Sequence, residues 1–364
     1  MKPYIPDTLP LKTLDWVQFI HLIGEANREL ALYEGVLKGI VNPAIMLTPL
    51  TTQEAVLSSK IEGTQATLEE VMEYEALPRK DAAKQEDIQE IINYRSALDY
   101  AVSYLKKKPI SLNLIKEIHD MLLNSVRGKN KARGQFRTTQ NYIGIDGTPI
   151  EQASYIPPPP ERVMELLSNL EKYIHAEEKD RLVQLAIVHA QFESIHPFLD
   201  GNGRVGRILI PLFLMEKKLL SSPVFYMSAY LEAHRDDYYK KLNALSKKRQ
   251  WEDWIIFFLE AVAEQARSNS RKATSILGLS NEMKIRVPEI THSQHAIRVL
   301  DLLFEKPLFN SQEFTKNLHV AKTSAARILN QLQTNRIVSV MQEGIGTRPT
   351  LLRFDKLAKI LEKT

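Results

Sequence analysis

One run of twelve residues combines side chains that bind phosphate with side chains that move protons. It reads His196-Pro197-Phe198-Leu199-Asp200-Gly201-Asn202-Gly203-Arg204-Val205-Gly206-Arg207. Its glycines let a backbone approach a ligand closely, and the amides at the start of a helix expected from Asn202 carry a positive field. Arg204 and Arg207 fall on neighbouring turns of that helix, so they can hold several phosphate oxygens. The run predicts a cradle for an anion, and favours a polyphosphate over a single phosphate.

Two more side chains of this run suit metal binding and proton transfer. Mg²⁺ usually takes one or two carboxylates together with substrate phosphates, so Asp200 alone suffices as its protein ligand. His196 stands four residues earlier and can remove a proton near neutral pH. A lone histidine is usually structural, but this one borders the predicted phosphate site, which favours a catalytic base.

A zinc site is the alternative for the same segment. It would use His189, Glu193 and His196, whose spacing differs from the H-E-x-x-H pattern. Three such residues on one helix rarely complete a site, so the sequence disfavours zinc.

Two common phosphate-binding motifs also fit the run only in part. Gly201, Gly203 and Gly206 match G-x-G-x-x-G, but that motif indicates a dinucleotide only after a β-strand, and a helical segment precedes it here. A P-loop would need a lysine and a hydroxyl where Arg207 and Ile208 stand. Neither motif explains the run.

The elements that must position this run are mainly helical. Apolar residues at three- and four-residue spacing predict helices through residues 14–105, then over 111–123, 161–175 and 181–195. Between them, an Asp-Gly pair follows the β-prone run 142–145, and residues 150–156 can return, so a β-hairpin is expected.

A carboxylate stands at one helix end upstream of the run. The helix expected over residues 51–62 stops at Gly63, which places Glu62 at its C-terminus. A carboxylate there opposes the helix dipole unless a cation meets it. Without such a cation, Glu62 is a solvated side chain.

The tail has a separate pattern. A winged helix-turn-helix is predicted here, from three helices over residues 296–303, 311–318 and 322–336 and two strands over 337–341 and 350–354. The best candidate for the linker before it is residues 269–288. The recognition helix would offer Lys322, Thr323, Ser324 and Arg327. Residues 285–364 hold 12 basic against 7 acidic residues, which suits DNA, although such modules also bind proteins or dimerise.

Composition excludes several classes of protein. The 364 residues, 44% hydrophobic and 25% charged, fit a globular chain of two or three domains. With no cysteine there is no disulfide, thiolate metal site or cysteine nucleophile. The start does not look like a signal peptide and the longest apolar run is too short for a membrane span, so a cytoplasmic protein without a membrane role is expected.

The run 196–207 resembles the signature of Fic-domain proteins, H-P-F-x-[DE]-G-N-G-R-x-x-R, at every defined position. Residues 133–144 are similar to the segment that leads into the β-hairpin flap of that family. Residues 58–63, Ser-Ser-Lys-Ile-Glu-Gly, resemble its inhibitory motif [ST]-x-x-x-E-[GN]. The resemblance implies a mainly α, Fic-type helical bundle: an N-terminal region with an inhibitory helix (1–105), a catalytic core (106–275) and the winged helix (285–364).

The resemblance also implies an activity, the transfer of AMP from ATP to a Ser, Thr or Tyr hydroxyl of a protein, which includes the chain itself. His196 would take the hydroxyl proton and Asp200 would hold Mg²⁺. Glu62, in a motif that begins at Ser58, would pair with Arg207 and inhibit. The implied nucleotide-binding set is Glu62, His196, Gly201, Asn202, Gly203, Arg204, Val205, Gly206, Arg207 and Tyr239.

The family pattern leaves other functions open. In some relatives the same glutamate supports removal of AMP, and dimers are common among relatives. Transfer of another nucleotide or of phosphocholine is disfavoured, because the matched residues are the usual ATP-dependent set. A nucleotide-sensing regulator that binds DNA through the tail is the alternative of a different class.

Overall fold

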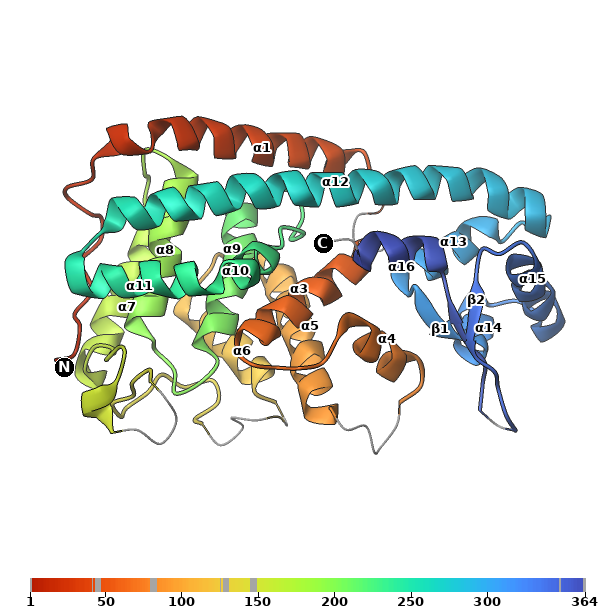
Figure 1. The fold of residues 1–364 in the computed structure, drawn as a ribbon, viewed down its shortest axis with the longest axis horizontal. Coiled ribbons are helices and arrows are strands. Elements are labelled where there is room, and N and C mark those ends of the chain that lie inside the picture. Colours follow the sequence, from red (N-terminus) through yellow and green to blue (C-terminus); the bar gives the residue numbers. More distant parts are fainter. Residues whose placement is uncertain are drawn as a thin grey trace.

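The computed structural model describes residues 2–40, 42, 47–78, 84–124, 126, 131–144, 149–346 and 348–362. Helices dominate it (Figure 1), as the sequence predicts. The N-terminal helices are α1 (Ile20–Lys38), α3 (Thr48–Ile61), α4 (Leu68–Ala76) and α5 (Gln85–Leu105), with a short 3-10 helix η1 (Trp16–Gln18). The central ones are α6 (Leu112–Leu122), α7 (Pro160–His175), α8 (Arg181–Ile195) and α9 (Asn202–Glu216), and α10 (Ser228–Ala233) and α11 (Arg235–Lys248) follow.

The pair α8 and α9 forms the centre of the core and carries the run 196–207, in which residues 196–201 form the loop between the helices and residues 202–207 begin α9. Thirteen of the fifteen residues of α8 are buried, which is typical of a helix that is apolar on all sides. Asp180 caps the start of α8, since its Oδ1 accepts hydrogen bonds from the amides of Leu182 and Val183 at 2.8 and 2.9 Å. The run 196–207 therefore begins at the end of a helix that is buried and whose first turn is capped.

A single helix, α12 (Trp251–Thr291), runs along most of the molecule, and α1 packs beside it (Figure 1). The predicted linker over residues 269–288 is wrong, because this stretch is the second half of α12. Ala273, Ile276, Met283 and Val287 are buried at helical spacing there, and this apolar stripe outweighs the polar residues between them. Within the described ranges, no helix is both long and apolar enough to span a bilayer.

The expected β-hairpin is only partly present. Ile143 and Tyr155 form one antiparallel bridge, while residues Ile150–Gln152, expected to be strand, form the 3-10 helix η2. The Asp-Gly turn lies outside the described residues. Prolines at 149 and 157 flank the returning segment and limit its strand pairing.

The tail holds four helices and a small sheet: α13 (Ala296–Glu305), α14 (Ser311–Leu318), α15 (Lys322–Thr334), α16 (Asp355–Glu362), β1 (Leu308–Asn310), β2 (Ser339–Gln342) and β3 (Leu351–Arg353). The strands are antiparallel in the order β1-β3-β2, and Leu352 pairs with both Phe309 and Val340. The three helices and two of the strands were predicted, whereas β1 and α16 were not. Their assignment as a winged helix-turn-helix stays a prediction.

Candidate active site

The loop from α8 to α9 makes two sharp changes of direction. His196 ends α8 in the left-handed conformation, with φ 49°, and its amide donates to the carbonyl of Phe192 at 3.0 Å. Gly201 precedes α9 with φ 74°, a conformation that favours glycine. These two turns mark the ends of the loop, which leads from His196 to the first backbone amides of α9.

Hydrogen bonds within the loop hold it in this form. The amide group of Asn202 accepts from the backbone N–H of Phe198 at 2.8 Å and donates to its carbonyl at 2.9 Å. Asn202 therefore positions the loop in addition to its predicted place beside the phosphates.

Arg137, a buried residue outside the loop, holds the loop through hydrogen bonds to backbone carbonyls. The Nε of Arg137 donates to the carbonyl of His196 at 2.9 Å, and its Nη2 donates to that of Pro158 at 2.6 Å. Arg137 lies in the segment that resembles the approach to the flap. The sequence placed it near the site but indicated no role for it.

A second histidine supports the loop and was missed by sequence reasoning. His119 of α6 stacks on Phe198, with ring centroids 3.7 Å apart. Its Nδ1 accepts from the amide of Gly134 at 2.9 Å, so its Nε2 carries the proton that bonds to the carbonyl of Asp200 at 3.0 Å. Burial lowers the pKa of His119 to about 4, which keeps this arrangement neutral at physiological pH.

His196 itself is half-buried and uncharged near pH 7. Burial lowers its pKa to about 4, although the carbonyl of Glu193 and the charge of Glu62 favour the protonated form. Among the described residues its Nδ1 has no hydrogen-bond partner. Because Nδ1 is also buried, a proton from a bound substrate can reach only the other ring nitrogen, Nε2, and a neutral imidazole can accept it there.

Arg204 is buried between two carboxylates. Its Nη1 lies 3.3 Å from Glu90 of α5, and its Nη2 lies 3.6 Å from Asp200. Thr64 also donates to Glu90, at 2.9 Å. The sequence singled out Arg204 and Asp200 but missed Glu90, which comes from a distant helix.

Asp200 is the more accessible carboxylate, with 40% of its side chain exposed. One carboxylate beside a phosphate cradle fits Mg²⁺, because the phosphates and water would supply the remaining oxygens. No cluster of three His, Cys, Asp or Glu side chains that could hold a metal by itself occurs in the described part of the chain.

Arg207 is held by the end of α3. Its side chain is 1% exposed, and its Nη2 lies 2.6 Å from Oε1 of Glu62. Its Nε donates to the hydroxyl of Ser58 at 2.8 Å and its Nη2 to the carbonyl of Ser58 at 2.9 Å. The carboxylate that the sequence placed at a helix C-terminus thus meets a cation.

This ion pair sets the protonation state of both partners. Burial raises the pKa of Glu62, but the charge and hydrogen bond of Arg207 outweigh that effect, so the net pKa lies below its usual value. Burial lowers the pKa of Arg207, and the charge of Glu62 more than reverses it. Both groups are therefore charged at neutral pH.

Two glycines make room for carboxylates. A Cβ on Gly203 would lie 2.2 Å from Oε1 of Glu62, and one on Gly206 would lie 2.3 Å from Oε1 of Glu193. Oε1 of Glu193 is buried without a hydrogen-bond partner among the described residues. Burial raises the pKa of Glu193 to about 7, although Arg207 lowers it.

A further buried acid on α3 escaped the sequence analysis. Glu54 accepts hydrogen bonds from the amide and hydroxyl of Ser228, at 3.1 and 2.5 Å. Burial raises its pKa to about 7, although those bonds and Arg207 lower it. Glu54, Ser58 and Glu62 follow one another at intervals of four, so they share one face of the helix.

Helix α11 supplies two tyrosines with different surroundings. Tyr239 is 41% exposed, and burial together with the charge of Glu62 raises its pKa to about 12. Its contact with the nucleotide stays a prediction. Tyr238 is buried, with its hydroxyl 3.0 Å from Nε2 of His189. His189 also contacts the carbonyl of Gly206 at 3.3 Å, so both of its ring nitrogens have partners.

The residues predicted for DNA contact lie on α15, away from this loop (Figure 1). Lys322, Thr323 and Ser324 are exposed. Arg327 is exposed as well, and its Nη1 donates to the carbonyl of Thr291, at the end of α12, at 3.1 Å. This bond gives Arg327 a structural role.

Comparison with known proteins places these features in one family. A model described as Fic/DOC family N-terminal matches residues 20–103, and one described as Fic/DOC family matches residues 109–214. Together they span just over half of the chain.

Named relatives agree with the family models. A probable protein adenylyltransferase of Aquifex aeolicus is 26% identical over 271 residues, which are 65% of this chain and 79% of that protein. The protein adenylyltransferase Fic of Drosophila grimshawi is 31% identical over 160 residues, 43% of this chain and 31% of that protein. The chain thus spans less than a third of the fly protein.

Solved structures share the fold. A Fic family protein from Desulfovibrio desulfuricans G20 superposes with a TM-score of 0.60 at 19% identity, over 96% of this chain and 98% of that one. Fic-1 from C. elegans superposes with a TM-score of 0.51 at 21% identity, over 72% and 74%. With both models matched across its N-terminal and central helices, the chain belongs to the Fic/DOC family.

Proposed function

We propose that this chain is a protein adenylyltransferase that moves AMP from ATP to a hydroxyl side chain and is restrained by its own α3. The observation that carries the proposal is the ion pair between Glu62, at the end of α3, and Arg207 of α9, the helix that follows the loop presenting His196. Relatives named as adenylyltransferases support the same chemistry.

The site residues have separate tasks in this reaction. His196, neutral at pH 7, takes the proton from the target hydroxyl as its oxygen attacks the α-phosphorus. A bond forms between that oxygen and phosphorus, and the bond to pyrophosphate breaks. The amides at the start of α9, with Arg204 and Arg207, orient the phosphates and stabilise their charge.

Asp200 would hold Mg²⁺ against the phosphates. When bound, the ion would neutralise charge on the departing pyrophosphate. Asp200 is already oriented, because its Oδ1 accepts from the amide of Gly201 at 2.5 Å.

The segment of the target protein that carries the hydroxyl would bind beside the flap, the stretch around the bridge of Ile143 with Tyr155. Asn141 donates to the carbonyl of Phe198 at 2.9 Å, which ties this edge to the catalytic loop. Ile143 is 42% exposed and pairs through its backbone with Tyr155. An extended target segment at this edge would gain backbone hydrogen bonds, which align a hydroxyl without a required sequence.

Inhibition follows from the use of Arg207. While Glu62 and Ser58 occupy its guanidinium, that group is not free to hold the terminal phosphate of ATP. ATP then binds without its triphosphate in the reactive orientation. Removal of the Glu62 carboxylate frees Arg207.

Two labels of ATP test the reaction. Glu62→Gly protein is incubated with Mg²⁺ and ATP labelled at either the α- or the γ-phosphate, and label in protein is counted. We expect label from the α-position only, and more than from wild type. Label from the γ-position would indicate phosphoryl transfer and contradict the proposal. No label, with ATP binding measured as intact, would favour AMP removal, another nucleotide or nucleotide sensing.

A further inference from the structure

The inner side of the tail is occupied by the rest of the chain. Asn310, at the end of β1, donates to the carbonyl of Ala76 in α4 at 2.7 Å. Gln53 of α3 donates to the carbonyl of Leu361 in α16 at 3.1 Å. A partner of the tail therefore has to bind on another side.

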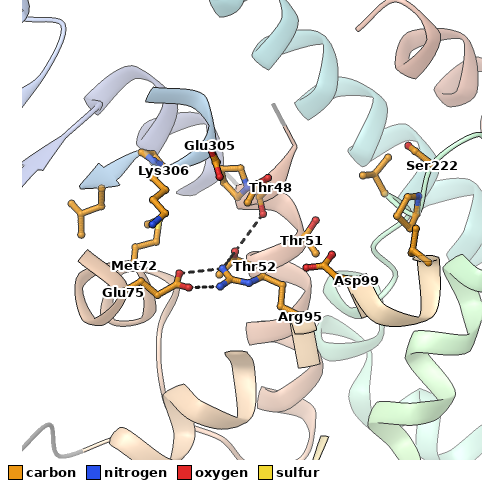
Figure 2. A pocket seen from close by; sticks show the side chains of 16 residues that line it. Thr48, Thr51, Thr52, Met72, Glu75, Arg95, Asp99, Ser222, Glu305 and Lys306 are labelled. Carbon is orange, nitrogen blue, oxygen red and sulfur yellow. Dashed lines mark hydrogen bonds and ion pairs between the residues drawn. The ribbon is translucent and has the colours of Figure 1, made fainter. Parts of the chain in front are cut away.

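Basic residues at this boundary between the tail and the N-terminal helices are paired. Figure 2 shows Arg95 of α5 against the carboxylate of Glu75, and one of its two hydrogen bonds there measures 3.1 Å. Lys306, which directly follows α13, forms an ion pair with Glu313 of α14. The charges of these cations are therefore balanced within the chain.

The outer side of the tail contains two helices joined by a short turn. α14 ends at Leu318 and α15 begins at Lys322, so three residues separate them, and the first of these, His319, has φ 53°. Helices joined by a turn of three or four residues are typical of a helix-turn-helix. The antiparallel strands β2 and β3 follow α15. Figure 1 shows α15 at the outer end of the tail, on the side away from α3.

Helix α15 has one buried face and one exposed face. The buried face consists of Ala325, Ile328, Leu329 and Leu332. The exposed residues of the opposite face are Thr323, Ala326, Arg327, Asn330 and Thr334. Hydroxyl, amide and guanidinium groups, together with the methyl group of alanine, are the groups that contact base edges in the major groove of DNA. The width of that groove admits an α-helix.

The segment that contains this face is basic. Residues 314–342 hold four Lys or Arg and no Asp or Glu, so the seven acidic residues of the tail all lie outside it. Lys316 and Lys322 stand on either side of the turn and are exposed. Neither forms an ion pair with another residue that the structure describes. Positive charge that the chain does not balance therefore lies at the start of α15.

We propose that the tail binds double-stranded DNA, with α15 in the major groove, its exposed face toward the base edges, and Lys316 and Lys322 on the phosphates. The phosphate charge of DNA complements the basic segment. A protein partner is the poorer fit, because the centre of a protein interface is apolar and aromatic, whereas this face is polar apart from Ala326. The inference is separate from AMP transfer and does not rest on it.

Binding is tested with the full chain and a fluorescein-labelled DNA duplex of about 30 base pairs and mixed sequence. Fluorescence anisotropy is measured at several NaCl concentrations between about 50 and 200 mM. We expect saturable binding that weakens as salt rises, with a slope of log affinity against log salt of about −2 or steeper, because each phosphate contact contributes about −0.9. No binding at the lowest salt, or equal affinity for a single strand of the same length, would overturn the proposal.

Variants locate the DNA on α15. Lys322→Ala should weaken binding about fivefold or more near 0.1 M salt and make the slope shallower by about 1. Ala326→Asp places an acid on the exposed face and should abolish binding through repulsion of the phosphates. Lys359→Ala, at an exposed lysine of α16, is the matched control and should change neither affinity nor slope. Unchanged binding by Lys322→Ala and Ala326→Asp, with folding confirmed by circular dichroism, would place the DNA elsewhere and refute the site.

Base contacts have their own readout. The full chain is used to select duplexes from a pool with a randomised central segment, and the selected sequences are compared with those selected by Asn330→Ala. We expect wild type to enrich a short motif, and Asn330→Ala to lose the preference at one position while its salt dependence stays that of wild type. Binding without any enriched motif would refute the contact of the exposed face with base edges.

Discussion

Replacement of Glu62 by glutamine removes the charge of the inhibitory carboxylate with little change of shape. In the structure this carboxylate lies 2.6 Å from a guanidinium that is 1% exposed. A hydrogen bond between charged groups contributes about 1.5–3 kcal/mol. Because a third of the Glu62 side chain is exposed, solvent screening favours the lower part of that range, about 2 kcal/mol. This corresponds to about a 30-fold shift toward an Arg207 that is free to hold ATP.

The assay measures initial rates of AMP transfer at ATP concentrations below saturation. We expect Glu62→Gln to raise the rate about 30-fold, and Glu62→Gly to raise it at least as much. Lys60→Ala is the matched control, since it breaks an exposed ion pair with Glu232, 2.8 Å long, at the same end of α3. It should change the rate less than about twofold. A rise below about threefold for Glu62→Gln, in a folded protein that binds ATP, would refute the inhibitory role of the ion pair.

Three further predictions concern stability and the supports of the site. Because the pKa of Glu54 is raised to about 7, the protonated form of this carboxyl stabilises the folded state. This contribution to the free energy of unfolding is complete below the usual pKa of 4.5 and is lost as pH rises through 7. Between pH 5 and 8, wild type should therefore lose about 2–3 kcal/mol of unfolding free energy relative to Glu54→Gln, measured by urea denaturation. Identical pH dependence of the two proteins would contradict the raised pKa of Glu54. His119→Phe keeps an aromatic ring but loses the hydrogen bond to the carbonyl of Asp200. AMP transfer in the Glu62→Gly background should therefore fall at least fivefold. An unchanged rate would show that His119 is not needed to hold the loop. Arg327→Ala should lower the free energy of unfolding by about 1 kcal/mol because its bond to the end of α12 is lost, whereas Lys322→Ala should not, and equal effects would refute that distinction.

The loop was predictable from the sequence because its chemistry is contiguous. Residues 196–207 carry the proposed base, the carboxylate, the glycines and both arginines within twelve positions, and local spacing was enough to infer an anion site. The helices around it were also predictable, since their apolar residues recur at helical spacing. Glu62 needed the resemblance to a family motif, because its partner Arg207 is far away in the chain.

The supports of the site were not predictable in the same way. His119, Glu90 and Glu54 reach the site from three different helices, and no local pattern marks a buried polar residue of this kind. Their roles depend on which helices pack together, which a single sequence does not reveal.

The linker prediction failed for a related reason. Residues 269–288 contain enough polar residues to suggest a break, but their buried positions follow a helical stripe that packs against neighbouring helices. The hairpin was overpredicted in the same manner, because a favourable turn sequence does not fix the length of the strands around it.

The central claim is that His196 transfers a proton in a reaction that Glu62 restrains. The most direct measurement compares label incorporation from ATP labelled at the α-phosphate, with Mg²⁺, in Glu62→Gly and in Glu62→Gly/His196→Ala, with ATP affinity measured in parallel. The account predicts strong labelling of the first and none above background in the second, at similar ATP affinity. Equal labelling of both would contradict the role of His196, and with it the proposed mechanism.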